Sequence, residues 1–284
     1  MPDALHREQP DVLFTIRFAG SAGFPRQAIT MSPTLRWVSV GGSGTDHLFP
    51  WDPSRLTVTN AAGVAAETMA QYGAAATLSF FLGLPKFVKA QRQKRWEPRP
   101  VASVKGRTLA ILGLGAVGQA MAKLAKALEM RVIGIRARPV ATAAVDRVDP
   151  PERLRAVLRE ADVVFVCLPL TRLTRGLMDA EALRTMKPGA ILIDVSRGGI
   201  IYQQALISVL ETGHLAGAAL DVFETEPLPP DSPLWTMDNV LVTPHCSSVY
   251  EGWQQRAIEM FCTNAERWKK GERLRNIVDP EKGY

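Results

Sequence analysis

The sequence predicts an α/β protein whose larger part is a doubly wound parallel sheet. From about residue 105 onward, short apolar runs alternate with amphipathic stretches, which is the strand, helix, strand order that builds parallel sheets. A glycine-rich segment, GLGAVG, directly follows the first apolar run of this region. The chain has 284 residues, of which 46% are hydrophobic, so it is long enough for two domains with separate cores.

The expected elements of the larger domain follow its apolar pattern. Apolar runs predict about six strands, and the stretches between them, each closed by Gly, Pro or charged residues, predict helices. The strands are expected at Leu109–Leu112, Val132–Ile135, Val163–Leu168, Ile191–Val195, Ala216–Val222 and Val240–Thr243, and the helices at Val117–Leu128, Pro151–Glu160, Ala180–Met186 and Gln203–Glu211.

The remaining segments predict a second, smaller α/β unit. Its strands are expected at Asp11–Ile16, Leu35–Val40 and Leu56–Asn60, and the amphipathic stretch Glu251–Lys270 is expected to return to it. A long Ala-rich helix is expected at Val64–Phe87, followed by a polar, Pro-flanked arm with Trp96. The expected domains are 1–61 with 251–284, and 62–250 with the arm near 85–100.

Composition excludes several function classes. Lys and Arg total 34 against 28 Asp and Glu, a net charge of +6 that suits small anionic ligands. The basic clusters at Lys86–Arg99 and Arg267–Arg275 belong to no recognisable nucleic-acid-binding motif, so we expect no nucleic-acid partner. Three cysteines without a CxxC pair argue against a disulfide framework and a zinc site. No apolar signal core and no run near the roughly 18 residues of a membrane span occur, so the expected location is cytoplasmic, away from the membrane.

The glycine-rich segment predicts a dinucleotide site. Gly113, Gly115 and Gly118 have GxGxxG spacing between a strand and a helix, where they allow a tight turn, the approach of a pyrophosphate, and close packing of helix on strand. The backbone amides of Ala116 and Val117 are expected to point at the phosphate from the positive end of that helix. The alternative is a glycine-rich turn that binds no ligand.

Two arginines predict the coenzyme. Folds of this kind that take NAD place an acidic residue about 20 positions past the motif, at the end of the second strand. Here that place holds Arg136, with Arg138 two residues later. If the stretch stays extended, both guanidinium groups lie on one face and can hold a 2′-phosphate. We therefore expect NADP(H), with NAD(H) as a weaker coenzyme, against the alternative of two solvated arginines.

Three polar side chains follow three strands of the predicted sheet. His245 comes after the strand that ends in NVLVT, Arg197 after Ile191–Val195 and Glu226 after Ala216–Val222, so all three are expected at the carboxyl edge, where ligands bind. Reduction of a 2-keto acid needs a cation for the carboxylate and carbonyl, a proton donor, and a carboxylate that orients and charges that donor. Arg197, His245 and Glu226 supply these three groups.

The motifs together closely resemble those of the D-2-hydroxyacid dehydrogenases, the D-isomer-specific NAD(P)-dependent enzymes. The resemblance extends from about Pro10 to Pro280 and rests on GSGTDHL, GLGAVG, CLPLTRLTRGLM, DVSRGGIIYQQAL, GHLAGAALDVFETEP, and SPLW followed by NVLVTPH. It implies a doubly wound Rossmann coenzyme domain inserted in a smaller, flavodoxin-like substrate domain. It also implies that the arm after Phe87 is a dimer contact, hence a homodimer.

The resemblance assigns roles to further residues. It implies that Arg197 and His245 bind substrate, that Glu226 pairs with His245, and that Asp221 contacts the nicotinamide carboxamide. The backbone amides of Gly42, Ser43 and Gly44 are implied to hold the substrate carboxylate, and the coenzyme cleft is implied to be lined by Leu168, Pro169, Thr174, Val195 and Ser196. We expect no metal, because Asp194 and Asp231 lack ligand spacing, and no nucleophilic role for Cys246 beside His245.

Several subtypes share these features. Formate dehydrogenases are similar but carry Gln where this chain has Glu226, so formate oxidation is disfavoured. The basic Arg136 and Arg138 make the chain resemble NADPH-using glyoxylate and hydroxypyruvate reductases, which implies a small 2-keto acid reduced to the D-2-hydroxy acid. Phenylpyruvate-type reductases and nucleotide-sensing corepressors on the same scaffold are the alternatives. Family members usually have a strand and helix before the segment resembling PDVLFT; we expect either a late start or a small domain short of one strand.

Overall fold

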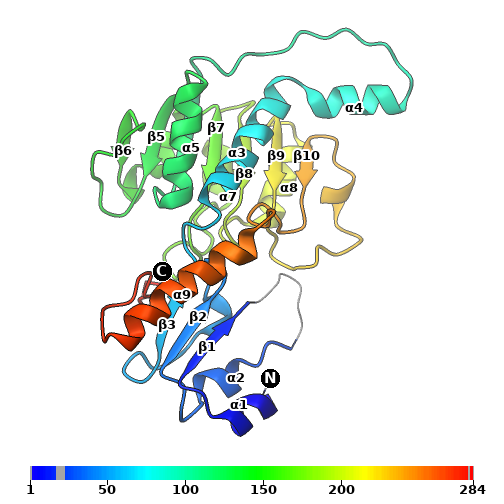
Figure 1. The fold of residues 1–284 in the computed structure, drawn as a ribbon. Coiled ribbons are helices and arrows are strands. Elements are labelled where there is room, and N and C mark those ends of the chain that lie inside the picture. The colour runs from blue at the N-terminus through cyan, green and yellow to red at the C-terminus, as the bar shows by residue number, and fades with distance from the viewer. Residues whose placement is uncertain (1, 17–22, 281, 284) are drawn as a thin grey trace. The chain divides into compact units, whose positions relative to one another are not determined.

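The α/β class expected from the sequence is confirmed, because both sheets of the protein consist of parallel strands. The computed structural model describes residues 2–16, 23–280 and 282–283. The chain divides into two units (Figure 1): unit 1 comprises 1–65 and 249–284, and unit 2 comprises 66–248.

Unit 2 is organised by a seven-stranded sheet in the order β10-β9-β8-β7-β4-β5-β6. Its strands are β4 (Thr108–Leu112), β5 (Arg131–Ile135), β6 (Arg147–Asp149), β7 (Val163–Val166), β8 (Ile191–Asp194), β9 (Gly217–Leu220) and β10 (Val240–Val242). The expectation of about six strands missed one strand, β6. This edge strand has three half-buried residues, RVD, and a run with a single apolar residue produces no recognisable pattern.

Helices cover both faces of this sheet. Alternate residues of β4 point to opposite sides: Leu109 and Ile111 pack with one set of helices, Ala110 and Leu112 with the other. The first set is α3 (Ala66–Phe81) and α5 (Ala116–Ala127), and the second is α6 (Leu154–Glu160), α7 (Ala180–Thr185) and α8 (Gln203–Glu211). Strands buried on two faces read as continuous apolar runs, which is why they were recognisable in the sequence.

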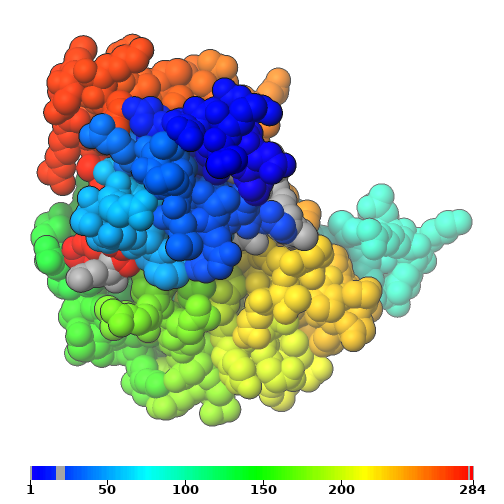
Figure 2. Space-filling model, turned by 90° about the horizontal axis from the view of Figure 1, so that it is seen from below, coloured from blue at the N-terminus to red at the C-terminus, as the bar shows by residue number. Residues whose placement is uncertain are grey.

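The long helix expected over 64–87 is two helices, so that expectation was wrong. Helix α3 ends at Phe81 and α4 (Leu84–Arg92) begins after Gly83, whose φ of +68° lies in the left-handed region. Pro85 stands in the first turn of α4, where its missing N–H costs nothing. Helix α4 and the chain after it project from the rest of unit 2 (Figures 1 and 2).

Unit 1 contains a three-stranded sheet in the order β1-β2-β3, formed by β1 (Val12–Thr15), β2 (Trp37–Val40) and β3 (Thr57–Asn60). Helices α1 (Pro2–Glu8), α2 (Arg26–Thr30) and α9 (Trp253–Lys269) complete it. The fully buried Trp37 donates from Nε1 to Thr59 Oγ1 at 2.9 Å, and its ring lies 5.2 Å from that of Phe261 in α9. The C-terminal segment therefore shares a core with the N-terminal strands, and Figure 2 shows the blue and orange-red segments together.

Short helices of unit 1 were not expected. No element was expected before Asp11, yet α1 buries Leu5 in the core of unit 1. Helix α2 likewise buries Ile29 completely. Both helices are too short to show a convincing helical period, and their stability comes from this packing rather than from local preference. In the described part of the chain, no helix combines the length and apolar content needed to cross a bilayer.

Candidate functional site

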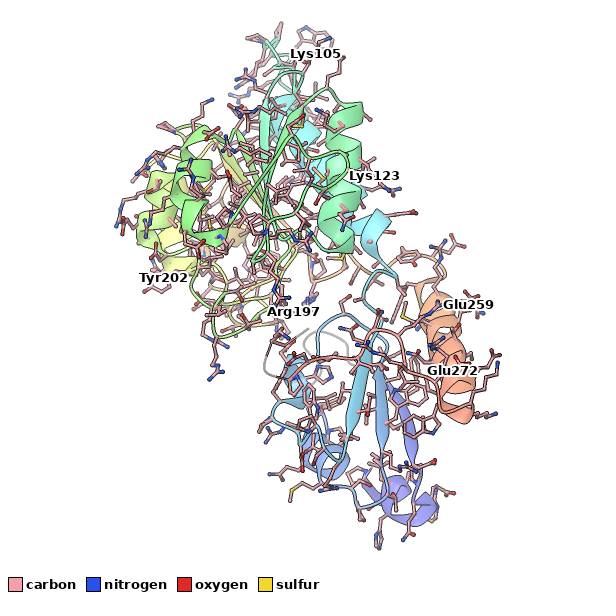
Figure 3. The ribbon with its side chains drawn as sticks, turned by 90° about the vertical axis from the view of Figure 1, so that its left-hand side faces the viewer. Lys105, Lys123, Arg197, Tyr202, Glu259 and Glu272 are labelled. Atoms are coloured by element: carbon pink, nitrogen blue, oxygen red, sulfur yellow. The ribbon has the colours of Figure 1, made fainter. Side chains whose placement is uncertain are left out.

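Three adjacent strands deliver the predicted acid, base and cation to one edge of the sheet. Strands β8, β9 and β10 are neighbours and run parallel, so their carboxyl ends meet at the same edge. Arg197 follows β8, Glu226 follows β9 and His245 follows β10. Figure 3 shows Arg197 at this end of unit 2, with Lys105, which precedes β4, at the opposite end.

Glu226 and His245 form a hydrogen-bonded pair. His245 Nδ1 lies 2.8 Å from Glu226 Oε2, and the two side chains are about one quarter and one fifth exposed, at 23% and 20%. The second oxygen, Oε1, accepts the Phe223 amide at 3.0 Å, which orients the carboxylate. With Nδ1 bonded to Glu226, Nε2 is the ring nitrogen that does not face the carboxylate.

The pKa of Glu226 lies below its ordinary value of 4.5. Burial by itself raises this pKa. The hydrogen bond and charge of His245, the Phe223 amide and the charge of Arg197 together lower it by more than burial raises it. Glu226 is therefore ionised at neutral pH.

Arg197 contributes positive charge to the same place. Its Nη1 donates to the carbonyl of Ser196 at 2.7 Å, and its positive charge contributes to the lowered pKa of Glu226. Gly198, the next residue, packs so closely that an added Cβ would lie 1.8 Å from the carbonyl oxygen of Phe223. The loop that carries Arg197 is thus pressed against the loop that carries Glu226.

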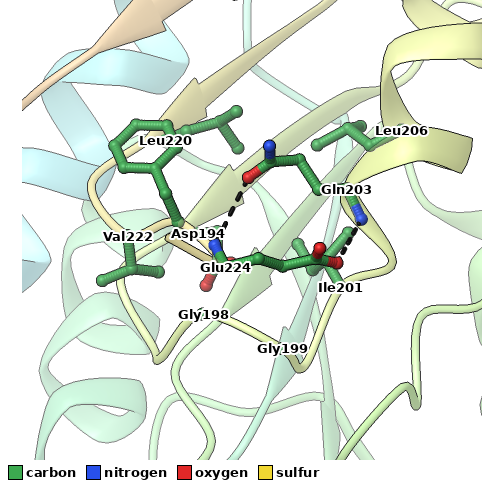
Figure 4. Close-up of a pocket in the computed structure, with 10 residues that line it drawn as sticks. Asp194, Gly198, Gly199, Ile201, Gln203, Leu206, Leu220, Val222 and Glu224 are labelled. Carbon is green, nitrogen blue, oxygen red and sulfur yellow. Dashed lines mark hydrogen bonds between the residues drawn. The ribbon is translucent and has the colours of Figure 1, made fainter. Parts of the chain in front are cut away.

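A pocket beside these loops shows how they are tied together (Figure 4). Its lining includes Gly198, Gly199 and the side chains of Gln203 and Glu224. The backbone amide of Gln203 donates to Glu224 Oε1 at 2.9 Å, and the backbone amide of Glu224 donates to Gln203 Oε1 at 3.3 Å. This reciprocal pair joins the start of α8 to the segment before Glu226.

The glycine-rich turn between β4 and α5 has the geometry of a phosphate cradle. Gly113 has φ +105°, and an added Cβ at Gly118 would lie 2.0 Å from the Gly113 carbonyl oxygen, so both positions require glycine. An added Cβ at Gly115 meets nothing within 4 Å, which is the open space that a ligand needs. Helix α5 begins at Ala116, so the amides of Ala116, Val117 and Gly118 have no intrahelical acceptor.

The arginines after β5 are only partly arranged as expected. Strand β5 ends at Ile135 and the chain bends at Ala137 and Arg138, so the condition of an extended stretch is not met. Strand alternation therefore does not place both guanidinium groups on one face. Arg136 is half-buried and Arg138 exposed, and in the described ranges neither forms an ion pair with a carboxylate. Their charge is available to an anion at the end of β5.

The residues implied to line the coenzyme cleft follow β7 and β8 at the same edge. Leu168 reaches the glycine-rich turn, with Cδ2 3.2 Å from the position of an added Gly113 Cβ. Thr174 Oγ1 donates to the Pro169 carbonyl at 2.6 Å and so closes the loop after β7. Val195 and Ser196 are buried, and the Ser196 amide donates to Asp194.

Both carboxylate oxygens of Asp221 accept hydrogen bonds within the protein. It is 1% exposed, and its oxygens accept hydrogen bonds from the Thr243 hydroxyl and from the amides of Cys246 and Ser247. These partners flank His245. Sequence reasoning missed Thr243 and its partner Tyr72, because hydroxyl groups 171 positions apart leave no spacing signal.

In unit 1, Gly42, Ser43 and Gly44 follow β2 in an irregular loop. The Gly42 carbonyl accepts the Ala61 amide at 2.9 Å, and the Ser43 carbonyl accepts the Asn60 side chain at 2.7 Å. Because a trans peptide points its C=O and N–H in opposite directions, the amides of Ser43 and Gly44 point away from β3. An added Cβ at Gly42 meets nothing within 4 Å.

Comparison with known proteins gives the family of the chain. Residues 74–247 match the family described as D-isomer specific 2-hydroxyacid dehydrogenase, NAD binding domain. A glyoxylate reductase of Korarchaeum cryptofilum is 36% identical over 264 residues, covering 88% of this chain and 78% of the relative.

Solved structures are similar along nearly the whole chain. A D-isomer specific 2-hydroxyacid dehydrogenase from Xanthobacter autotrophicus Py2, in complex with NADPH and MES, has a TM-score of 0.86 at 36% identity and covers 95% of this chain and 85% of its own. An NADPH-dependent glyoxylate/hydroxypyruvate reductase from Sinorhizobium meliloti, in complex with NADP and sulfate, has a TM-score of 0.85 at 26% identity, covering 98% and 89%. The chain therefore belongs to the D-isomer specific 2-hydroxyacid dehydrogenase family.

Proposed function

We propose that this protein reduces a small 2-keto acid of the glyoxylate or hydroxypyruvate type to the D-2-hydroxy acid, with NADPH as the preferred coenzyme. The observation that carries the proposal is the hydrogen-bonded Glu226–His245 pair beside Arg197, on the edge of the sheet that also bears the glycine-rich turn. The named relatives above, a glyoxylate reductase and an NADPH-dependent glyoxylate/hydroxypyruvate reductase, support the same substrate class.

Each residue has a chemical task in this proposal. Arg197 binds the substrate carboxylate and polarises the keto group. His245 donates a proton from Nε2 to the keto oxygen, and Glu226 holds the ring through Nδ1 and stabilises its charge. The bound coenzyme supplies the hydride that the keto carbon receives.

The coenzyme fits the residues that are present. Gly115 leaves room for a pyrophosphate, and the first amides of α5 can donate to it. Arg136 stands where an NAD-specific site has a carboxylate, and a guanidinium without a carboxylate partner favours a 2′-phosphate over a free ribose hydroxyl. The cytoplasmic location, and the homodimer formed through the arm near 85–100, remain predictions that go with this proposal.

The test follows the absorbance of NADPH and of NADH with glyoxylate, hydroxypyruvate, pyruvate and phenylpyruvate. With NADPH as coenzyme, we expect the turnover of glyoxylate and of hydroxypyruvate to exceed that of phenylpyruvate. Glyoxylate yields an achiral product, so the D configuration is read by chiral chromatography of the lactate formed from pyruvate. A preference for phenylpyruvate indicates the larger substrate class. Tight NADPH binding without any turnover indicates a nucleotide-sensing protein and refutes the proposal.

The role of His245 is tested with His245→Asn, which keeps a polar side chain and removes the proton donor. We expect kcat to fall roughly 10²- to 10⁴-fold, the range typical of a lost general acid. His6→Asn in the exposed helix α1 is the matched control and is expected to retain wild-type activity. Unchanged turnover of His245→Asn contradicts the assignment.

A further inference from the structure

The turn that carries His245 is tied down on both sides by one buried carboxylate. Asp221 Oδ1 accepts the Thr243 hydroxyl at 2.6 Å and the Cys246 amide at 2.9 Å. Its Oδ2 accepts the Ser247 amide at 3.0 Å. Asp221 stands directly after β9, so it anchors the end of β10 and the turn that follows to the neighbouring strand.

A second hydroxyl extends this network to helix α3. Tyr72 Oη lies 3.0 Å from Thr243 Oγ1. A threonine hydroxyl has one proton, and the Thr243 proton points to Asp221, so Tyr72 must be the donor to Thr243. Burial raises the pKa of Tyr72 to about 12, against the lowering effect of its bond to Thr243, so its proton is present at every working pH. The hydrogen bonds thus run in one direction, from Tyr72 through Thr243 to Asp221.

His245 needs such support because its backbone is unfavourable. Its φ of +52° lies in the left-handed region, which costs a non-glycine residue roughly 1–2 kcal/mol. Residues held in this region persist when their surroundings determine the conformation. Here the His245 amide donates to the Thr243 carbonyl at 3.0 Å, and the next two amides are held by Asp221. The left-handed backbone in turn aims the ring at Glu226.

We propose that Tyr72, Thr243 and Asp221 form a positioning network that holds His245 in its proton-donating orientation. The inference rests on the proposed function and adds to it three positioning residues that act through the His245 turn. Glu226 orients the ring from its Nδ1 side, whereas this network fixes the backbone from which the ring extends. Thr243 and Tyr72 act on the chemical step through the His245 turn, because both reach it through Asp221 and the end of β10.

The test compares Thr243→Val, which keeps the shape and removes the hydroxyl, with Thr243→Ser, which keeps the hydroxyl. We expect Thr243→Val to lower kcat roughly 10- to 100-fold, the scale of a small misplacement of a reacting group, and Thr243→Ser to restore most of it. Tyr72→Phe removes one neutral hydrogen bond and is expected to lower kcat about 5-fold. Tyr202→Phe, at an exposed tyrosine, is the matched control. The dissociation constant of NADPH is expected to stay within about two-fold in all of them.

A measurement that needs no turnover accompanies the kinetics. The amides of Cys246 and Ser247 should exchange their hydrogens faster in Thr243→Val and Tyr72→Phe than in the wild type, because their acceptor is less well held. The proposal is overturned if kcat of Thr243→Val stays within about two-fold of wild type, if Thr243→Ser is as slow as Thr243→Val, or if exchange is unchanged. If the wild type reduces no keto acid, the proposed function fails, and exchange in Tyr72→Phe still decides whether the network holds the turn.

Discussion

The buried carboxyl group of Asp194 is predicted to make the free energy of unfolding depend on pH. Asp194 ends β8, is 2% exposed, and accepts the Ser196 amide and the Ser196 hydroxyl. Burial raises its pKa from 3.8 to about 7; the Ser196 bonds and Arg197 oppose the rise, and the nearby Asp221 adds to it. The folded protein therefore keeps a proton on Asp194 at pH values where the unfolded chain has lost it.

The sign and size follow from this difference. Because the folded pKa is raised, the free energy of unfolding falls as pH rises from about 4 to about 7 and is level above that. Between pH 5 and pH 8 the proton difference persists for about two pH units, at about 1.4 kcal/mol each, or about 3 kcal/mol in total. Asp194→Asn keeps an acceptor for Ser196 and removes the titration.

The assay is urea unfolding of the wild type and Asp194→Asn at pH 5 and pH 8. We expect the variant to gain about 3 kcal/mol relative to the wild type on going from pH 5 to pH 8. Contributions of groups that do not interact with Asp194 cancel in this comparison, as does any pH-independent effect of the amide. Asp238→Asn, at a carboxylate whose side chain is 68% exposed, is the control. A wild-type-to-variant difference that is equal at both pH values refutes the reasoning.

Three further predictions concern the coenzyme and the acid–base pair. Arg136→Asp should shift the ratio of kcat/KM for NADPH over NADH by about 10- to 100-fold toward NADH, the worth of a charged hydrogen bond to the 2′-phosphate; retained NADPH selectivity contradicts this. Gly118→Ala should lower the free energy of unfolding by about 1–3 kcal/mol, because the added Cβ meets backbone atoms. Gly115→Ala, whose added Cβ meets open space, should fold normally and weaken NADPH binding, measured by fluorescence titration. Equal stability of the two variants counts against the packing argument. The lowered pKa of Glu226 stabilises the folded protein above pH 4.5, and this contribution is lost as pH falls through the pKa of the folded state. Glu226→Gln should therefore lose less stability on acidification than the wild type, as measured by thermal unfolding at a series of pH values. Identical acid profiles of the two proteins contradict this prediction.

The strands of unit 2 were predictable because each is buried on both faces and reads as an apolar run. The prediction failed where the pattern is short or interrupted. Strand β6 has one apolar residue among three, and the break between α3 and α4 depends on the left-handed Gly83, which leaves the apolar composition on either side unchanged. The bend at Arg138 is a further case, because a two-residue alternation assumes a strand that here ends at Ile135.

The sequence by itself determined the local units: apolar runs, the glycine spacing between β4 and α5, and the polar residues that follow strand ends. These depend on neighbours within a few positions, so their physics is visible in the order of residues. The tertiary structure alone decided which strands are adjacent, and hence that Glu226 bonds His245 at 2.8 Å and that Tyr72 reaches Thr243 from a helix 171 positions away. A hydrogen bond requires separations of about 3 Å, and that precision comes only from packing β8, β9 and β10 side by side under α3.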